Sequence, residues 1–169
     1  MNYTFAERRH WFEEYLQRID QCKVATPHLG VRHTCPCCGY PTLGERAHYE
    51  ICDLCSWEDD GQDNPEADEV WGGPNYHLSL SQARQNFELY LDKYPPDQAN
   101  YFGGPDNTTE LTAKSDMIAA FDAMISRNDP TVLNDLWECV YRSQAALLEE
   151  LYRKRSPKDR RYLRHLRRL

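Results

Sequence analysis

Apolar residues recur at helical spacing in several stretches of this chain, and each stretch is bounded by residues that cap or break helices. Thr4 and Glu7 form a capping-box pair ahead of a first helix, which should end before Pro27. Ser79 is placed to cap a second helix, and Pro95-Pro96 would stop it. The pattern thus predicts one helix before and one helix after a central region rich in cysteine.

The C-terminal half shows the same pattern more strongly. A third helix is expected around residues 111–127. Asp129-Pro130 is typical of an N-cap followed by proline at the first helical position, and it begins the longest and most apolar of the predicted helices. Ser156-Pro157 repeats this arrangement and predicts a last helix, whose apolar positions are Leu163, Leu166 and Leu169. We therefore expect about five helices in all.

Two short strands are expected between the first two helices, over residues 40–43 and 48–51, joined near Gly44-Glu45. Such a hairpin would bring together the cysteines that precede and follow it. The predicted fold class is α+β and mostly helical, with a small four-cysteine zinc ribbon or β-hairpin packed against the helices. The expected organisation has three parts: an N-terminal helix over 1–32, a zinc-ribbon domain with its following helix over 33–94, and a C-terminal helical region over 95–169 that ends in a basic helix.

The chain contains seven cysteines, and five of them lie within residues 35–55. An odd number of cysteines is not typical of a disulfide framework. Two C-x-x-C turns, here called knuckles, are separated by 13 residues, close to the spacing of zinc sites built from two such pairs. Four thiolates complete a tetrahedral shell and leave no position for water, so the site would be structural. The expected zinc ligands are Cys35, Cys38, Cys52 and Cys55.

Three neighbouring side chains offer alternatives for one ligand position. They are Cys37, the spare thiol of the first knuckle, His33 and His48. Redox chemistry at the knuckles is a weaker interpretation, because no βαβ pattern accompanies them. The remaining cysteines, Cys22 and Cys139, lie on apolar faces of predicted helices and are expected to be buried without a role.

The composition makes a stabilising metal ion useful to the fold. Leu, Ile, Val and Phe account for 31 of 169 residues, which predicts a thin core, although eleven Tyr and four Trp add large apolar areas. The longest apolar run, residues 117–121, is far shorter than the roughly 20 residues that a membrane helix needs. Charged residues near the amino terminus stand where a secretory signal needs an apolar stretch, so the expected location is the cytoplasm.

Charge is unevenly distributed along the chain. Residues 153–169 hold nine Lys or Arg against one acidic residue, whereas residues 53–69 hold eight acidic residues and no basic one. Such an acidic field attracts basic protein surfaces and repels nucleic acid, although acid-rich loops are also often simply solvated. Two nearby tryptophans could anchor an interface or cover the metal site. The candidate partner-binding residues are Trp57, Glu58, Asp59, Asp60, Asp63, Glu66, Asp68, Glu69 and Trp71.

The basic C-terminal stretch has three interpretations. Its leucines could dock on the acidic body of the chain while its arginines meet acidic residues, it could contact a partner protein, or it could bind nucleic acid. We favour docking on the body, because a leucine stripe needs covering and the formal net charge of the whole chain is −7 in spite of this basic stretch. Nucleic-acid binding would have to overcome that acidic body.

Familiar catalytic motifs are missing from the sequence. The chain has no HExxH, no GxSxG and no glycine-rich phosphate loop. Glu58, Asp59 and Asp60 are consecutive in a predicted loop, where neighbouring side chains point in different directions, so we do not expect them to converge on one ion. The sequence therefore favours a protein that is not an enzyme.

The stretch CPCCGYPTLGERAHYEICDLCSWEDDG, followed by NYHLSLSQARQNF, resembles the bacterial cysteine-rich CPCC family. The resemblance covers about residues 33–91. Asp53 stands where proline is common in the family and Ser56 where an aromatic residue is common, and neither position is an expected metal ligand.

The resemblance implies a zinc-binding module, and some related proteins resemble immunity proteins of toxin systems. We therefore expect a non-enzymatic zinc protein that acts by protein–protein binding and neutralises a cognate bacterial toxin. The alternative is a zinc-ribbon protein that binds nucleic acid or regulates another process.

Overall fold

The structure is a computed structural model that describes residues 1–22, 32–98 and 104–154, except for the side chains of residues 20–22 and 130. Within these residues the fold is α+β and mostly helical, as the sequence predicted. The elements are α1 (Phe5–Cys22), β1 (His33–Thr34), β2 (Pro41–Leu43), α2 (Leu80–Tyr90), α3 (Thr108–Arg127) and α4 (Pro130–Lys154). The predicted last helix, which starts at Ser156-Pro157, lies outside the described residues.

Capping side chains explain where the helices begin. Thr4 and Glu7 form the predicted capping box, since the Thr4 N–H donates to the Glu7 carboxylate at 2.7 Å and the Glu7 N–H to Thr4 Oγ1 at 3.3 Å. Ser79 caps α2 in the same reciprocal way. Asn107 forms a third capping box that the sequence analysis missed, so α3 begins at Thr108, earlier than predicted.

The end of α2 differs from the prediction. The helix ends at Tyr90 rather than at the proline pair, because Leu91 adopts a left-handed conformation with φ of 58° and its N–H donates to the Phe87 carbonyl at 3.0 Å. The next residues turn back toward the cysteines, and the Lys93 N–H donates to the Cys55 carbonyl at 2.8 Å. A tertiary hydrogen bond therefore replaces the last predicted turn of the helix.

The strand pairing also differs from the prediction. β2 pairs in antiparallel fashion with β1, not with residues 48–51. Ala47 and Tyr49 have φ of 58° and 59°, which is incompatible with a regular strand, and Ile51 instead forms an isolated bridge with Glu58. Each knuckle is thus closed by its own short antiparallel pairing. The prediction of a single hairpin that pairs residues 40–43 with residues 48–51 was therefore wrong.

Aromatic side chains join the cysteine region to the helices. Tyr40 stacks on Phe121 of α3 with ring centroids 5.0 Å apart, and it meets Phe12 of α1 and Phe87 of α2 edge-on at 6.1 and 6.5 Å. Its hydroxyl donates to Asp122 at 2.8 Å. The core therefore lies between the knuckles and the four helices, since Trp137, Val140 and Leu147 of α4 also belong to it, and aromatic rings compensate for its few aliphatic residues.

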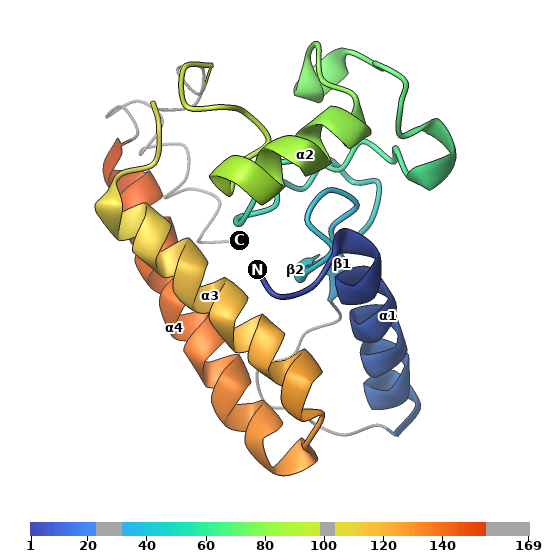
Figure 1. Ribbon diagram of the computed structural model, residues 1–169, viewed down its shortest axis with the longest axis vertical. Coiled ribbons are helices and arrows are strands. Elements are labelled where there is room, and N and C mark those ends of the chain that lie inside the picture. The colour runs from blue at the N-terminus through green and yellow to red at the C-terminus, as the bar shows by residue number, and fades with distance from the viewer. Residues whose placement is uncertain (23–31, 99–103, 155–169) are drawn as a thin grey trace.

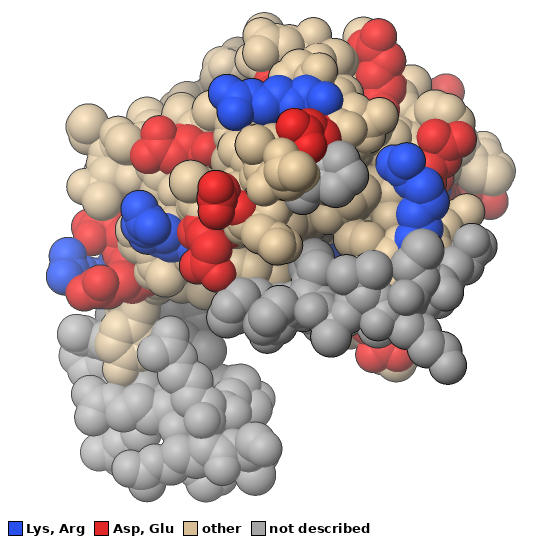
Figure 2. Space-filling view, turned by 90° about the horizontal axis from the view of Figure 1, so that it is seen from below, with Lys and Arg blue, Asp and Glu red and all other residues tan. Residues whose placement is uncertain are grey.

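Figure 1 shows how the helices surround this core. α3 and α4 run side by side as an antiparallel pair, α1 lies on the other side of the knuckles, and α2 crosses above them. Acidic and basic side chains are interspersed on the face seen in Figure 2. None of the described helices is long and apolar enough to span a lipid bilayer.

The two cysteines outside the knuckles were predicted to be buried. Cys139 is exposed on α4, so that prediction was wrong. Successive residues of an α-helix are about 100° apart, so Cys139 points well away from the face that buries Trp137 and Val140. The side chain of Cys22 lies outside the described residues.

Candidate metal centre

The first knuckle is a tight turn closed by backbone hydrogen bonds. The Cys35 N–H donates to the Tyr40 carbonyl and the Gly39 N–H to the Cys35 carbonyl, both at 2.9 Å. Gly39 has φ of 79°, and a Cβ at this position would lie 3.1 Å from the Phe5 carbonyl oxygen. Glycine is required here both by the left-handed backbone and by the close approach of α1.

The second knuckle repeats these connections. The Cys52 N–H donates to the Trp57 carbonyl at 2.8 Å and the Ser56 N–H to the Cys52 carbonyl at 2.9 Å. Ser56 takes the place of the glycine, with φ of 64°, and its hydroxyl donates to Asp92 at 2.6 Å. The two knuckles are therefore equivalent structures, in which an aromatic residue follows the turn at the same spacing.

The knuckles bring together the four predicted thiols. Their sulfur atoms all lie within 4.8 Å of one another, and the four side chains are fully buried. Two of the separations are 3.6 Å, from Cys35 to Cys55, and 3.8 Å, from Cys38 to Cys52. A tetrahedral ion with metal–sulfur bonds of about 2.3 Å requires sulfur–sulfur distances of about 3.8 Å. The donor set and its spacing therefore fit a metal ion with no open coordination position.

Hydrogen bonds and burial set the electrostatics of the thiols. Burial raises the pKa of Cys35, Cys38 and Cys55 well above the usual value. Despite burial, hydrogen bonds from the neighbouring thiols and from Thr42, whose hydroxyl lies 3.0 Å from the sulfur, lower the pKa of Cys52. Four thiolates in such a place need a cation among them, because burying unpaired charge is costly.

Three basic side chains, from Arg8, Arg84 and Lys93, lie around the thiols. Arg8, fully buried in α1, donates to the Cys38 carbonyl at 2.9 Å, and Arg84 of α2 donates to the Pro36 carbonyl at the same distance. Lys93 lies beside Trp57, and its burial lowers the pKa of its ammonium group, whereas the nearby Cys55 raises that pKa. A divalent ion with four thiolates carries a net charge of −2, which these cations partly offset.

The alternative ligands do not join the cluster. Cys37 is only 1% exposed, but its sulfur is not part of the group, and its N–H donates to the Cys35 sulfur at 3.4 Å. The His48 side chain is 62% exposed and lies 3.1 Å from Glu45. No disulfide connects the cysteines that the structure describes.

Two of the candidate partner-binding residues are fully buried. Trp57 closes the second knuckle, and the Asp59 carboxylate accepts hydrogen bonds from Arg46 Nε at 2.7 Å and from the Ala47 N–H at 2.8 Å. Their predicted role at an exposed interface was wrong. Tyr40 and Trp57 stand at the same distance after the first cysteine of their knuckles. This equal spacing was a sequence signal that Trp57 is buried like Tyr40, whereas a count of charges carries no such information.

Several other acids of the stretch are also used inside the molecule. Asp63 pairs with Arg9 and Arg46, and Asp60 accepts from the Asn75 amide at 3.2 Å. Glu58 and Glu66 are half-buried. The exposed members of the predicted set are Asp68, Glu69 and Trp71.

The exposed members share a loop with two other exposed apolar side chains. Val70 is 56% exposed, Trp71 47% and Tyr76 52%. We call Asp68, Glu69, Val70, Trp71 and Tyr76 the 68–76 surface. Figure 1 shows this loop, in green, projecting beyond α2 and away from the α3–α4 pair.

The fold and the site define a small protein with a buried four-cysteine cluster embedded among helices. Residues 33–91, about a third of the chain, match the family described as cysteine-rich CPCC. The matched segment contains both knuckles and α2, which packs on them. No significant match was found among curated proteins or solved structures.

Proposed function

We propose that this protein binds zinc structurally and acts by binding another protein, most specifically as an immunity protein that neutralises a toxin. The observation that carries the proposal is the fully buried four-cysteine cluster. Tetrahedral sulfur coordination is typical of structural zinc, and a closed shell offers no position for a substrate or for an activated water. The metal would hold the two knuckles together, and the surface that they support would bind the partner protein.

The 68–76 surface supports binding of a basic protein partner. It combines two acidic residues with exposed Trp71 and Tyr76, and aromatic side chains commonly provide most of the affinity at protein interfaces. The loop is held in place by hydrogen bonds, from Trp71 Nε1 to Glu69 at 3.3 Å and from the Ser81 hydroxyl to Asp68 at 2.6 Å. An acidic surface speeds association with a basic partner and orients the complex.

A toxin is the partner class we favour. Toxins that act on nucleic acids or nucleotides often have basic active-site clefts, and inhibition by occlusion needs a stable scaffold and a complementary surface but no chemistry. The proposed function involves no catalysis by this protein.

The test is co-expression with the product of the neighbouring gene in the source genome. Expression of that gene alone should stop growth, and the present protein should restore it. Asp68→Lys combined with Glu69→Lys, and separately Trp71→Ala, should abolish the rescue and leave the zinc content unchanged. Reversal of Asp59 is unsuitable, because that buried side chain serves the fold.

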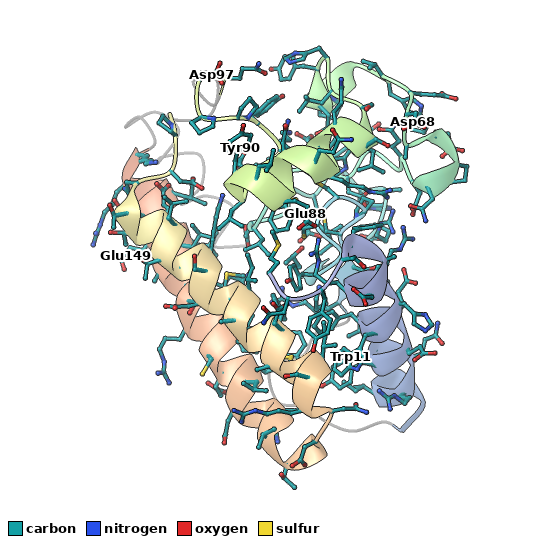
Figure 3. The ribbon with its side chains drawn as sticks, viewed as in Figure 1. Trp11, Asp68, Glu88, Tyr90, Asp97 and Glu149 are labelled. Carbon is teal, nitrogen blue, oxygen red and sulfur yellow. The ribbon has the colours of Figure 1, made fainter. Side chains whose placement is uncertain are left out.

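Glu149→Lys is the matched control. Glu149 is an exposed acid on α4, and Figure 3 shows it on the opposite side of the molecule from Asp68. This variant should rescue as well as the wild type. A neighbouring gene without toxicity, or rescue that survives all the changes in the 68–76 surface, would remove support for the proposal. So would turnover by the purified protein.

A further inference from the structure

A pocket of about 530 Å³ lies next to the second knuckle. Its walls come from residues 51–58, from the segment after α2, from the start of α3 and from the end of α4. This volume is within the usual range for sites that bind a small ligand. It is separate from the 68–76 surface, none of whose residues lines it.

The pocket exposes apolar side chains that the core leaves uncovered. Ile51 is 47% exposed, Tyr90 40% and Leu111 40%, and all three line the pocket together with Leu148 and Leu151 of α4. Exposed apolar residues gathered around one cavity indicate a place where apolar side chains of another segment can be buried.

The charged lining of the pocket is mostly acidic. It contains five carboxylates, from Asp53, Glu58, Asp92, Asp106 and Glu110, against two lysines, Lys93 and Lys154. Asp92 and Asp106 also pair with the buried Lys114, so the carboxylates still outnumber the lysines around the pocket. Glu110 is the most informative, because its side chain is fully buried. One carboxylate oxygen accepts from the Asn107 N–H at 2.7 Å and pairs with Lys154, whereas the other has no hydrogen-bond partner among the described residues. A buried carboxylate oxygen without a partner favours a ligand that brings a donor.

Lys154 connects the pocket to the rest of the chain. It is the last residue of α4, it lines the pocket, and its ammonium donates to the Pro105 carbonyl at 2.9 Å. The chain therefore leaves the described structure at the pocket wall. Residues 155–169 follow, with seven Lys or Arg against one acidic residue and with leucines at positions 163, 166 and 169.

We propose that this pocket is a binding site for a basic, leucine-bearing peptide segment and that its occupant is residues 155–169 of the same chain. The apolar lining matches the leucines, and the excess of carboxylates over lysines matches the basic side chains. Because the segment is attached directly to the pocket wall, its effective local concentration is on the order of millimolar, which favours it over free competitors. The inference goes beyond the proposed function and does not depend on it.

Limited proteolysis of the full-length, zinc-loaded protein tests the inference. Trypsin cleaves after Lys and Arg, so the rate at which it releases fragments of residues 155–169 reports how often the segment leaves the pocket. Ile51→Gln combined with Leu111→Gln removes two apolar contacts without adding a trypsin site, and release should become about tenfold faster. Glu110→Gln keeps the capping arrangement of α3 and removes the charge, and it should also speed release.

Leu89→Gln is the matched control, because Leu89 is 71% exposed on α2 and does not line the pocket. It should leave the rate unchanged, as should Trp71→Ala. An added synthetic peptide of residues 155–169 should accelerate release by competition, and a scrambled peptide should not. Equal release rates in the wild type and both sets of pocket variants would overturn the proposal. A dimer in solution that the pocket variants dissociate would also overturn it, since the occupant would then belong to a second copy.

Discussion

Replacement of a single metal ligand should cost this protein most of its stability. Cys52→Ser removes one of four thiolates in a fully buried cluster. Structural zinc contributes about 10–16 kcal/mol of apparent binding free energy in small zinc-binding peptides at neutral pH, whereas whole domains are stable by about 5–15 kcal/mol. Loss of even half of the metal's contribution would therefore be comparable to the entire stability of the fold. We expect Cys52→Ser to retain no stoichiometric zinc and to lose its cooperative thermal transition.

Cys37→Ala is the matched control, because Cys37 is as deeply buried but its sulfur lies outside the cluster. Removing the sulfur leaves a small cavity at a cost of about 1–2 kcal/mol, equivalent to a fall of several degrees in Tm for a chain of this size. Alanine is a better choice than serine, which would bury a hydroxyl. This variant should keep its full zinc content.

Metal analysis of protein purified without chelator, combined with thermal melting followed by circular dichroism, measures both effects. The expected pattern is about one zinc per chain in the wild type and in Cys37→Ala, and none in Cys52→Ser. The reasoning is refuted if the wild type holds less than about half an equivalent of metal. It is also refuted if Cys37→Ala loses zinc as completely as Cys52→Ser does.

Two further predictions concern the supports of the site. Gly39→Ala should lower the free energy of unfolding by about 1–3 kcal/mol in denaturant titrations, since the added methyl is strained by the positive φ and crowds Phe5; an unchanged midpoint would contradict this. Asp63→Asn should cost about 1 kcal/mol at pH 7, because Arg9 and Arg46 hold the pKa of Asp63 below its usual range in spite of partial burial. A depressed pKa gives stability that is present above about pH 4 and lost at lower pH, so the difference between variant and wild type should shrink on acidification; a difference that grows would show the sign to be wrong.

Local signals in the sequence predicted those parts of the fold that local interactions determine. The starts of α1, α2 and α4 follow from Thr4, Ser79 and Asp129, whose side chains accept hydrogen bonds from backbone groups within three residues. The four clustered thiols follow from the spacing of the two knuckles, since each pair is set by its own turn.

The parts that the sequence did not predict depend on long-range contacts. The partner of β2 is β1 because the first knuckle closes on itself, which no alternation of residues could show. Asp59 resembles its exposed acidic neighbours in sequence, and only the fold brings it the Arg46 side chain and the Ala47 N–H that make its burial possible. Arg8 and Lys93, the buried cations near the thiols, have no sequence motif, because each is brought there by packing of its own helix or turn.

The position of Tyr40 couples the first knuckle to three of the helices. The residue follows directly from the first knuckle, and its ring touches one aromatic side chain from each of α1, α2 and α3. When the knuckle opens, α1, α2 and α3 lose this shared contact at once, and the core, to which α4 also contributes, loses its central ring. Metal release and helix melting should accordingly occur in one cooperative transition, and a chelator added to the native protein should be as effective a denaturant for the distant helices as for the cysteine turns.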